Sequence, residues 1–149
     1  MVLEPMIGIL IIAHGSLGES LIQCATHVLG ARPSRVESLG VSSRGDPDLL
    51  LAEAKRVIAA LDEGAGVLVL TDICGGTPAN VSSRTIAPGQ VEAIAGVSLP
   101  MLIRALTYRS QPLAVVMTKA LSGGRDGVSV LEAESGVPRS SGGQCHAAG

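Results

Sequence analysis

Residues 6–19 of the chain read MIGILIIAHGSLGE. The first part, 7–13, is an uninterrupted apolar run rich in isoleucine, which is typical of a strand buried on both faces of a parallel sheet. His14 and Gly15 end this run, and residues 16–19 match the S-x-x-E capping box that begins a helix. The stretch therefore predicts a strand followed directly by a helix, with a histidine at the turn between them.

The same alternation of short apolar runs and helical periods continues along the chain. We expect strands at 7–13, 35–41, 66–71 and 91–95, an edge strand at 128–131, and helices that begin at Ser16, Asp46-Pro47, Thr77-Pro78, Ser98 and near Leu113, the last stopping at Gly123-Gly124. Strands that alternate with helices imply right-handed βαβ units and a parallel sheet. The sequence thus predicts one three-layer α/β domain over residues 1–134, for which we expect the common strand order 2-1-3-4. Residues 135–149 are rich in Gly and Ser and lack periodicity, so we expect a disordered tail there.

The composition restricts the function classes. The 149 residues include no Trp or Phe and a single Tyr, so the core must be aliphatic. A net charge of −2 and the lack of stacking aromatics argue against binding of nucleic acid. Cys24, Cys74 and Cys145 are too far apart in sequence for a zinc site or a disulfide framework. No signal peptide and no run of about 20 apolar residues is visible, so we expect a cytoplasmic protein.

Two polar residues directly follow expected strands. His14 ends the first strand and Asp72 ends the third. In open parallel sheets, ligands bind at the carboxyl ends of the strands near a switch in strand order. If the first and third strands are neighbours, the Asp72 carboxylate accepts a hydrogen bond from Nδ1–H of His14 and leaves Nε2 as a nucleophile. His14 and Asp72 are therefore the candidate catalytic pair.

The residues around this pair suit a phosphoryl group, which brings about two negative charges. The expected helix N-termini at Ser16 and Thr77 offer free N–H donors to an anion. Gly75-Gly76 lets the backbone approach an anion closely, and the Thr77 hydroxyl adds a donor. We expect Gly15, Ser16, Gly75, Gly76 and Thr77 to bind the phosphoryl group, without a metal, nucleotide or other cofactor.

Each of these residues also has an ordinary structural interpretation. His14 alone could be a structural hydrogen-bonding residue, Asp72 a turn cap and Gly75-Gly76 a simple turn before a helix. Their combination at two strand ends is what favours a site. Cys74 lies beside them without a base or metal partner in the sequence, and we interpret it as a wall residue.

Other catalytic motifs are absent. There is no P-loop and no dinucleotide fingerprint. Residues 14–18, HGSLG, approach the nucleophile elbow but begin with His where the motif has Gly. His27 lies in the first expected helix and His146 in the tail, so a serine nucleophile lacks a base and a serine hydrolase is disfavoured.

Three segments in order resemble the EIIA component of the mannose family of the sugar phosphotransferase system (PTS). His14-Gly15 resembles that family's opening motif, and residues 72–80, DICGGTPAN, match its D-x-x-G-G-[ST]-P-x-N segment. Residues 91–102, VEAIAGVSLPML, match its VIAGVNLPML stretch, with Ser98 where Asn is usual. Residues 124–128 resemble the segment that leads to its last strand. The resemblance covers residues 6–131.

The resemblance implies a function. His14 would accept a phosphoryl group from the phosphocarrier HPr at Nε2 and pass it to an EIIB partner. Asp72 would orient His14, and Thr77 with its neighbouring backbone would hold the phosphoryl group. The protein would be a homodimer that exchanges an antiparallel fifth strand, here residues 127–132, and would meet the membrane only through a permease complex.

Two departures and several alternatives stay open. Cys74 stands where the family often has a bulky aromatic residue. No Ala/Pro linker to an EIIB domain follows Leu131, so this EIIA would stand alone or have its EIIB partner on a separate chain. A regulatory phosphoacceptor that moves no sugar would carry the same site. A dihydroxyacetone-kinase phosphotransfer subunit, a tetrapyrrole metal chelatase and a non-catalytic α/β binding domain rank lower.

Overall fold

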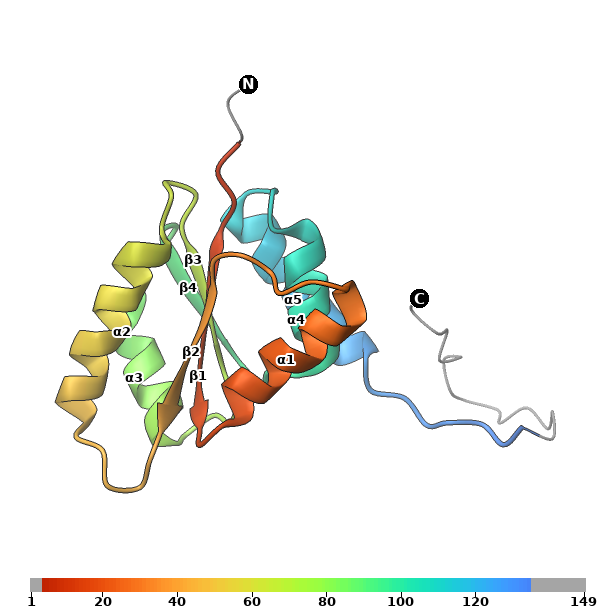
Figure 1. Ribbon diagram of the computed structural model, residues 1–149, viewed down its shortest axis with the longest axis horizontal. Coiled ribbons are helices and arrows are strands. Elements are labelled where there is room, and N and C mark those ends of the chain that lie inside the picture. Colours follow the sequence, from red (N-terminus) through yellow and green to blue (C-terminus); the bar gives the residue numbers. More distant parts are fainter. Residues whose placement is uncertain (1–3, 135–149) are drawn as a thin grey trace.

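The computed structural model describes residues 4–134 and has three layers, a parallel sheet between two layers of helices (Figure 1). The strands are β1 (Gly8–His14), β2 (Val36–Val41), β3 (Val67–Thr71) and β4 (Val91–Ala95), in the order β2-β1-β3-β4. The helices are α1 (Leu17–Leu29), α2 (Pro47–Leu61), α3 (Thr77–Thr85), α4 (Leu99–Tyr108) and α5 (Leu113–Asp126). The predicted α/β class, parallel pairing and strand order are confirmed. The expected tail, 135–149, lies outside the described residues.

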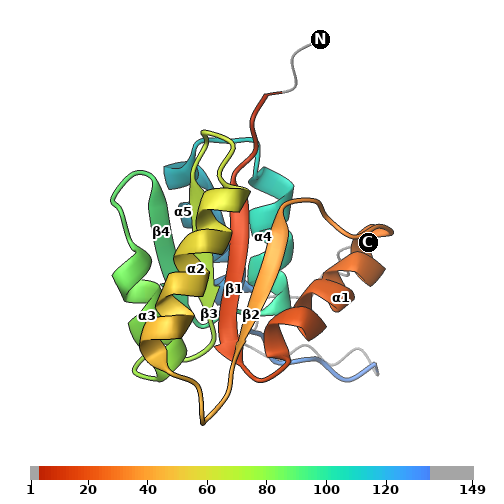
Figure 2. The same cartoon turned by 60° about the vertical axis from the view of Figure 1, so that its left-hand side comes forward.

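The alternation of side chains along β1 divides the core in two. Ile9 and Ile11 belong to the cluster on the face covered by α1, α4 and α5, and Leu10 and Ile12 belong to the cluster under α2 and α3 (Figures 1 and 2). All four side chains are fully buried. Successive residues of a strand point to opposite faces, so a strand covered on both faces must be apolar throughout.

Two of the predicted helix starts have the expected caps. The Asp46 carboxylate accepts a hydrogen bond from the Asp48 N–H at 2.9 Å, and the Ser98 hydroxyl accepts one from Met101 N–H at 3.3 Å. Pro47 and Pro100 lie in the first turns that follow. Each cap satisfies a backbone donor that has no acceptor within the helix.

The predicted capping box at residues 16–19 is wrong. Ser16 is the N-cap residue of α1, but its side chain makes no capping hydrogen bond. The Glu19 carboxylate binds Arg32 at 2.8 Å and accepts a hydrogen bond from Ser38 at 3.3 Å instead. These two partners come from segments that the local sequence pattern does not include, and they take the carboxylate away from the start of the helix.

Two other boundaries differ from the prediction. Thr77 is the first residue of α3 and Gly76 is its N-cap, so the Thr77 side chain does not cap the helix. Helix α5 continues through Gly123-Gly124 to Asp126. A Cβ at Gly123 would lie 2.6 Å from Cβ of Arg104, so this glycine allows close packing of α5 on α4 instead of ending the helix.

The expected fifth strand is not formed in the single chain. Residues 128–133 adopt no regular structure, and Val128, Val130 and Leu131 are 82%, 60% and 71% exposed. A strand needs a neighbour that satisfies its backbone groups, and this segment pairs with none of the four strands of the described sheet. Exchange of the segment between two chains therefore stays a prediction.

Candidate active site

Strands β1 and β3 are neighbours, which brings His14 and Asp72 to the same edge of the sheet. Ile12 pairs with Thr71 in the register of the two strands, so both strands end within two residues of that pair. The Asp72 carboxylate accepts two hydrogen bonds from His14 through one oxygen, Oδ2. The backbone N–H donates at 2.9 Å and Nδ1 lies at 2.7 Å. The carboxylate therefore holds both the backbone and the ring of His14.

This contact determines which ring nitrogen of His14 is free. An ionised carboxylate only accepts hydrogen bonds, so Nδ1 carries the proton and Nε2 carries the lone pair. The side chain of His14 is 56% exposed, whereas that of Asp72 is 13% exposed. The imidazole thus presents a nucleophilic nitrogen towards solvent while its partner carboxylate stays covered.

Partial burial raises the pKa of the Asp72 carboxyl, but hydrogen bonds outweigh this effect. The backbone N–H and the ring of His14 and the N–H of Ile73 stabilise the ionised form, with a smaller contribution from the charge of His14. The net result is a pKa below the ordinary value for Asp. Asp72 therefore stays charged throughout the neutral range and keeps its hold on His14.

The segment between β3 and α3 provides backbone donors beside the ring. A Cβ built on Gly76 would lie 3.3 Å from Cε1 of His14, so this glycine lets the backbone approach the imidazole. Gly75 has φ +95°, a left-handed conformation that favours glycine. No hydrogen bond to a described residue is made by the N–H groups of Gly75, Gly76 or Thr77. Free N–H groups at a helix N-terminus form a site for an anion.

The other predicted site residues flank this contact. Gly15 has φ +56°, and its N–H donates to the Val41 carbonyl at 3.0 Å, which occupies the donor that an anion would need. The side chains of Ser16 and Thr77 make no hydrogen bond with the described part of the chain. The structure thus brings His14 and Asp72 into contact, with the backbone of Gly76 beside the imidazole, and leaves Gly15, Ser16, Gly75 and Thr77 around them.

Two residues that shape this edge were missed from the sequence. A Cβ at Gly40 would lie 2.4 Å from the Gly15 carbonyl oxygen, so only glycine lets β2 lie against the turn after His14. A glycine inside an expected strand was the available signal. Thr71, the last residue of β3, is 2% exposed and its hydroxyl has no partner among the described residues. It was the one hydroxyl in an otherwise aliphatic strand.

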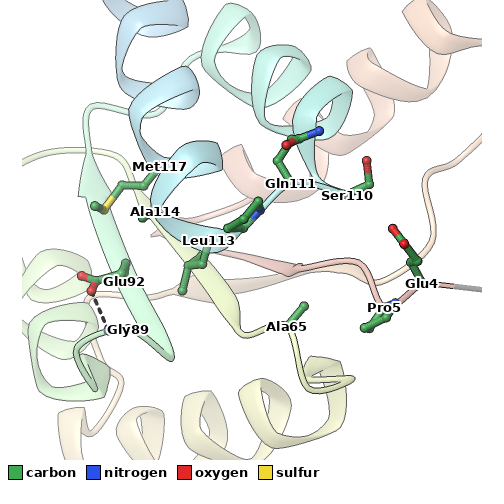
Figure 3. Close-up of a pocket in the computed structure, with 11 residues that line it drawn as sticks. Glu4, Pro5, Ala65, Gly89, Glu92, Ser110, Gln111, Leu113, Ala114 and Met117 are labelled. Carbon is green, nitrogen blue, oxygen red and sulfur yellow. Dashed lines mark hydrogen bonds between the residues drawn. The ribbon is translucent and has the colours of Figure 1, made fainter.

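A shallow hollow of about 630 Å³ lies at the opposite, amino-terminal edge of the sheet (Figure 3). Its charged lining residues are Glu4 and Glu92, and Glu92 accepts a hydrogen bond from the Gly89 N–H at 3.0 Å. Within residues 4–134, no group of three or more His, Cys, Asp or Glu side chains is placed to hold a metal ion. The side chains arranged for chemistry are those at the carboxyl edge.

Residues 8–120 match the EIIA-man family, which is described as the PTS system fructose IIA component. The chain belongs to this family. It is 33% identical over 131 residues to the mannose-specific EIIAB component of the PTS of Escherichia coli, a match that covers 86% of this chain and 40% of that protein. It is 30% identical over 105 residues to the fructose-specific EIIA component of Bacillus subtilis, covering 70% of this chain and 71% of the relative.

Solved structures share the fold. The mannose/sorbose-specific IIA subunit of Enterococcus faecalis superposes with a TM-score of 0.78 at 18% identity, over 87% of this chain and 98% of that one. The EIIA component from Streptococcus agalactiae gives a TM-score of 0.73 at 24% identity, over 83% and 95% of the two chains. Among the described residues of this family member, no helix is both long and apolar enough to cross a membrane.

Proposed function

We propose that this EIIA-man chain carries a phosphoryl group on Nε2 of His14, taking it from phospho-HPr and passing it to an EIIB partner. The observation that carries the proposal is the 2.7 Å contact between Nδ1 of His14 and Asp72. That contact leaves Nε2 unprotonated on a ring that is 56% exposed, where a donor protein can reach it.

The transfer balances without a cofactor. The Nε2 lone pair attacks phosphorus, a P–N bond forms, and the bond from phosphorus to the donor atom of phospho-HPr breaks, with the electron pair leaving on that atom. The His14 ring then carries a positive charge, which the Asp72 carboxylate stabilises across the Nδ1–H hydrogen bond. The second transfer reverses these events towards the nucleophile of the EIIB partner.

The free N–H groups of Gly75, Gly76 and Thr77 are suited to the phosphoryl oxygens. They lie at the N-terminus of α3, next to the ring, and the dipole of a helix adds positive potential at that end. The exposed hydroxyl of Thr77 provides a further donor. The developing negative charge is thereby shared by the backbone and not by a metal ion.

Family membership supports the proposed partners. The chain matches 40% of the length of the E. coli EIIAB protein, so the activity of that whole protein is proposed here only for its EIIA step. HPr as donor, an EIIB chain as acceptor, a cytoplasmic location and a homodimer that pairs residues 127–132 with a second copy belong to the same proposal. The three exposed apolar residues Val128, Val130 and Leu131 favour such pairing, because they gain burial in a dimer.

Labelling tests the proposal directly. The full chain is incubated with enzyme I, HPr and labelled phosphoenolpyruvate, and we expect acid-labile, base-stable label on the wild type. His14→Ala should take no label, whereas the matched control His27→Ala, an exposed histidine on α1, should be labelled as the wild type is. Wild-type protein that stays unlabelled with competent donors would falsify the phosphoryl-carrier function.

A further inference from the structure

Thr71 carries a buried hydroxyl without a partner. It is 2% exposed, and its Oγ1 is the single buried side-chain polar atom among residues 4–134 that makes no hydrogen bond. Other buried hydroxyls are satisfied, since Ser82 donates to the Pro78 carbonyl and Thr85 to the Ser82 carbonyl, both at 2.6 Å. An unpaired buried hydroxyl costs free energy, so its retention calls for an explanation.

The position of Thr71 places this hydroxyl beneath the start of α3. Val67 and Val69 of the same strand point into the cluster under α2 and α3, and Thr71 continues that alternation. Its partner in the register, Ile12, faces the same cluster, and His14 follows Ile12 by two residues on the same face. Helix α3 begins at this edge and packs on β1, β3 and β4. The hydroxyl therefore lies below His14 and the first turn of α3.

The first turn of α3 has a backbone N–H that lacks an acceptor. The N-cap residue Gly76 has no side chain that could accept a hydrogen bond, and Pro78 has no N–H. The N–H of Ala79, a residue that is 9% exposed, donates to no described residue. Ala79 is the third residue of the helix, whose N–H is ordinarily satisfied by the N-cap side chain. The Thr71 hydroxyl and the Ala79 N–H thus lie on the same side of the sheet, and neither has a partner among the described residues.

We propose that Thr71 is a positioning residue of the phosphoryl site, whose hydroxyl accepts a hydrogen bond from Ala79 N–H when His14 is phosphorylated. The inference rests on the proposed function. Gly75 and Gly76 lie in the turn before α3, and in this proposal the turn shifts when a phosphoryl group on Nε2 attracts its free N–H groups. As the turn closes on the anion, the Ala79 N–H approaches the Thr71 hydroxyl. The hydroxyl then caps α3 and holds the N–H groups of the turn against the phosphoryl group.

Thr71→Val is the first test, because valine has the same shape and no hydroxyl. The unphosphorylated variant should melt at the wild-type temperature or a few degrees above it, since no hydrogen bond is lost there. Its phosphohistidine should hydrolyse about fivefold faster than that of the wild type, the factor that corresponds to one ordinary hydrogen bond. Thr71→Ser should restore the wild-type lifetime.

Thr85→Val is the matched control. Its buried hydroxyl already has an acceptor, so this variant should melt at a lower temperature while its phosphohistidine keeps the wild-type lifetime. The amide resonance of Ala79 in nuclear magnetic resonance adds a local readout. It should move downfield on phosphorylation of the wild type and of Thr71→Ser, and not of Thr71→Val.

The outcomes separate the two proposals. Label on His14 with equal phosphohistidine lifetimes in wild type and Thr71→Val overturns the role of Thr71 and leaves the carrier function intact. Absence of label on the wild type removes the carrier function and the inference together. A Thr71→Val protein that melts well below the wild type before phosphorylation shows that the hydroxyl has a purely structural role, and this also overturns the inference.

Discussion

A side chain with several ring or guanidinium nitrogens lies at each edge of the sheet, Arg109 at the amino edge and His14 at the carboxyl edge. The two residues differ in how many of these nitrogens form hydrogen bonds within the protein. At the amino edge, Arg109 is 7% exposed, and its guanidinium donates to the carbonyls of Ile7, Ser34 and Arg35. At the carboxyl edge, the ring of His14 gives one nitrogen to Asp72 and leaves the other free. A buried group whose donors are bound to carbonyls stabilises the fold, whereas an exposed group with a free nitrogen is available for chemistry.

The two edges also differ in what shifts the pKa of their charged groups. Burial lowers the pKa of Arg109, an effect that the negative charge of Glu63 opposes and the positive charge of Arg35 reinforces. A guanidinium remains protonated in proteins, so Arg109 holds its charge against fixed carbonyls. At the other edge, hydrogen bonds from His14 hold the pKa of Asp72 below its ordinary value, and the carboxylate serves a ring that can change its own bonding.

The largest effect on stability is expected at the amino edge. Arg109→Met removes the side-chain donors to the carbonyls of Ile7, Ser34 and Arg35 and should lower the free energy of unfolding by about 3 kcal/mol, measured by urea denaturation. Arg32→Met is the control, because the ion pair between Arg32 and Glu19 is solvent-exposed and should contribute little to the free energy of unfolding. Equal losses in the two variants would contradict the structural role of Arg109.

The carboxyl edge should show the opposite pattern. Asp72→Asn keeps the shape of the side chain but removes the charge that selects the Nδ1–H tautomer and stabilises the phosphorylated ring. We expect phosphoryl transfer to slow by about a hundredfold, measured as the rate of labelling from phospho-HPr. The change in urea stability should be smaller than for Arg109→Met. An unchanged transfer rate would remove Asp72 from the mechanism.

The smallest effect concerns acid pH. Because the folded pKa of Asp72 lies below the unfolded one, its ionised form adds stability that is complete above the ordinary value of 3.8 and is lost as the pH falls through the folded pKa. The stability difference between wild type and Asp72→Asn should therefore be constant near neutral pH and shrink below pH 3.8. Urea denaturation from pH 7 down into this range measures it, and a difference that persists unchanged in acid would contradict the low pKa.

The local pattern was sufficient where a segment depends on its own residues. The apolar run before His14 predicted β1, and Asp46-Pro47 and Ser98 predicted two helix starts whose caps the structure confirms. The pattern failed where a distant residue competes. Glu19 pairs with Arg32 and Ser38, so the capping box at Ser16 does not form, and α5 runs past Gly123 because α4 packs against it.

The sequence by itself determined the class of the fold and the positions of His14 and Asp72 at two strand ends, because periodicity is a local property of the chain. Only the tertiary structure decided which partners each group has. It joined Asp72 to the backbone N–H and to Nδ1 of His14, and it paired the N–H of Gly15 with the Val41 carbonyl. It also left the Thr71 hydroxyl without a partner among the described residues. A hydrogen bond forms only when donor and acceptor are placed to within a few tenths of an ångström. For segments far apart in sequence, this placement is set when the layers pack.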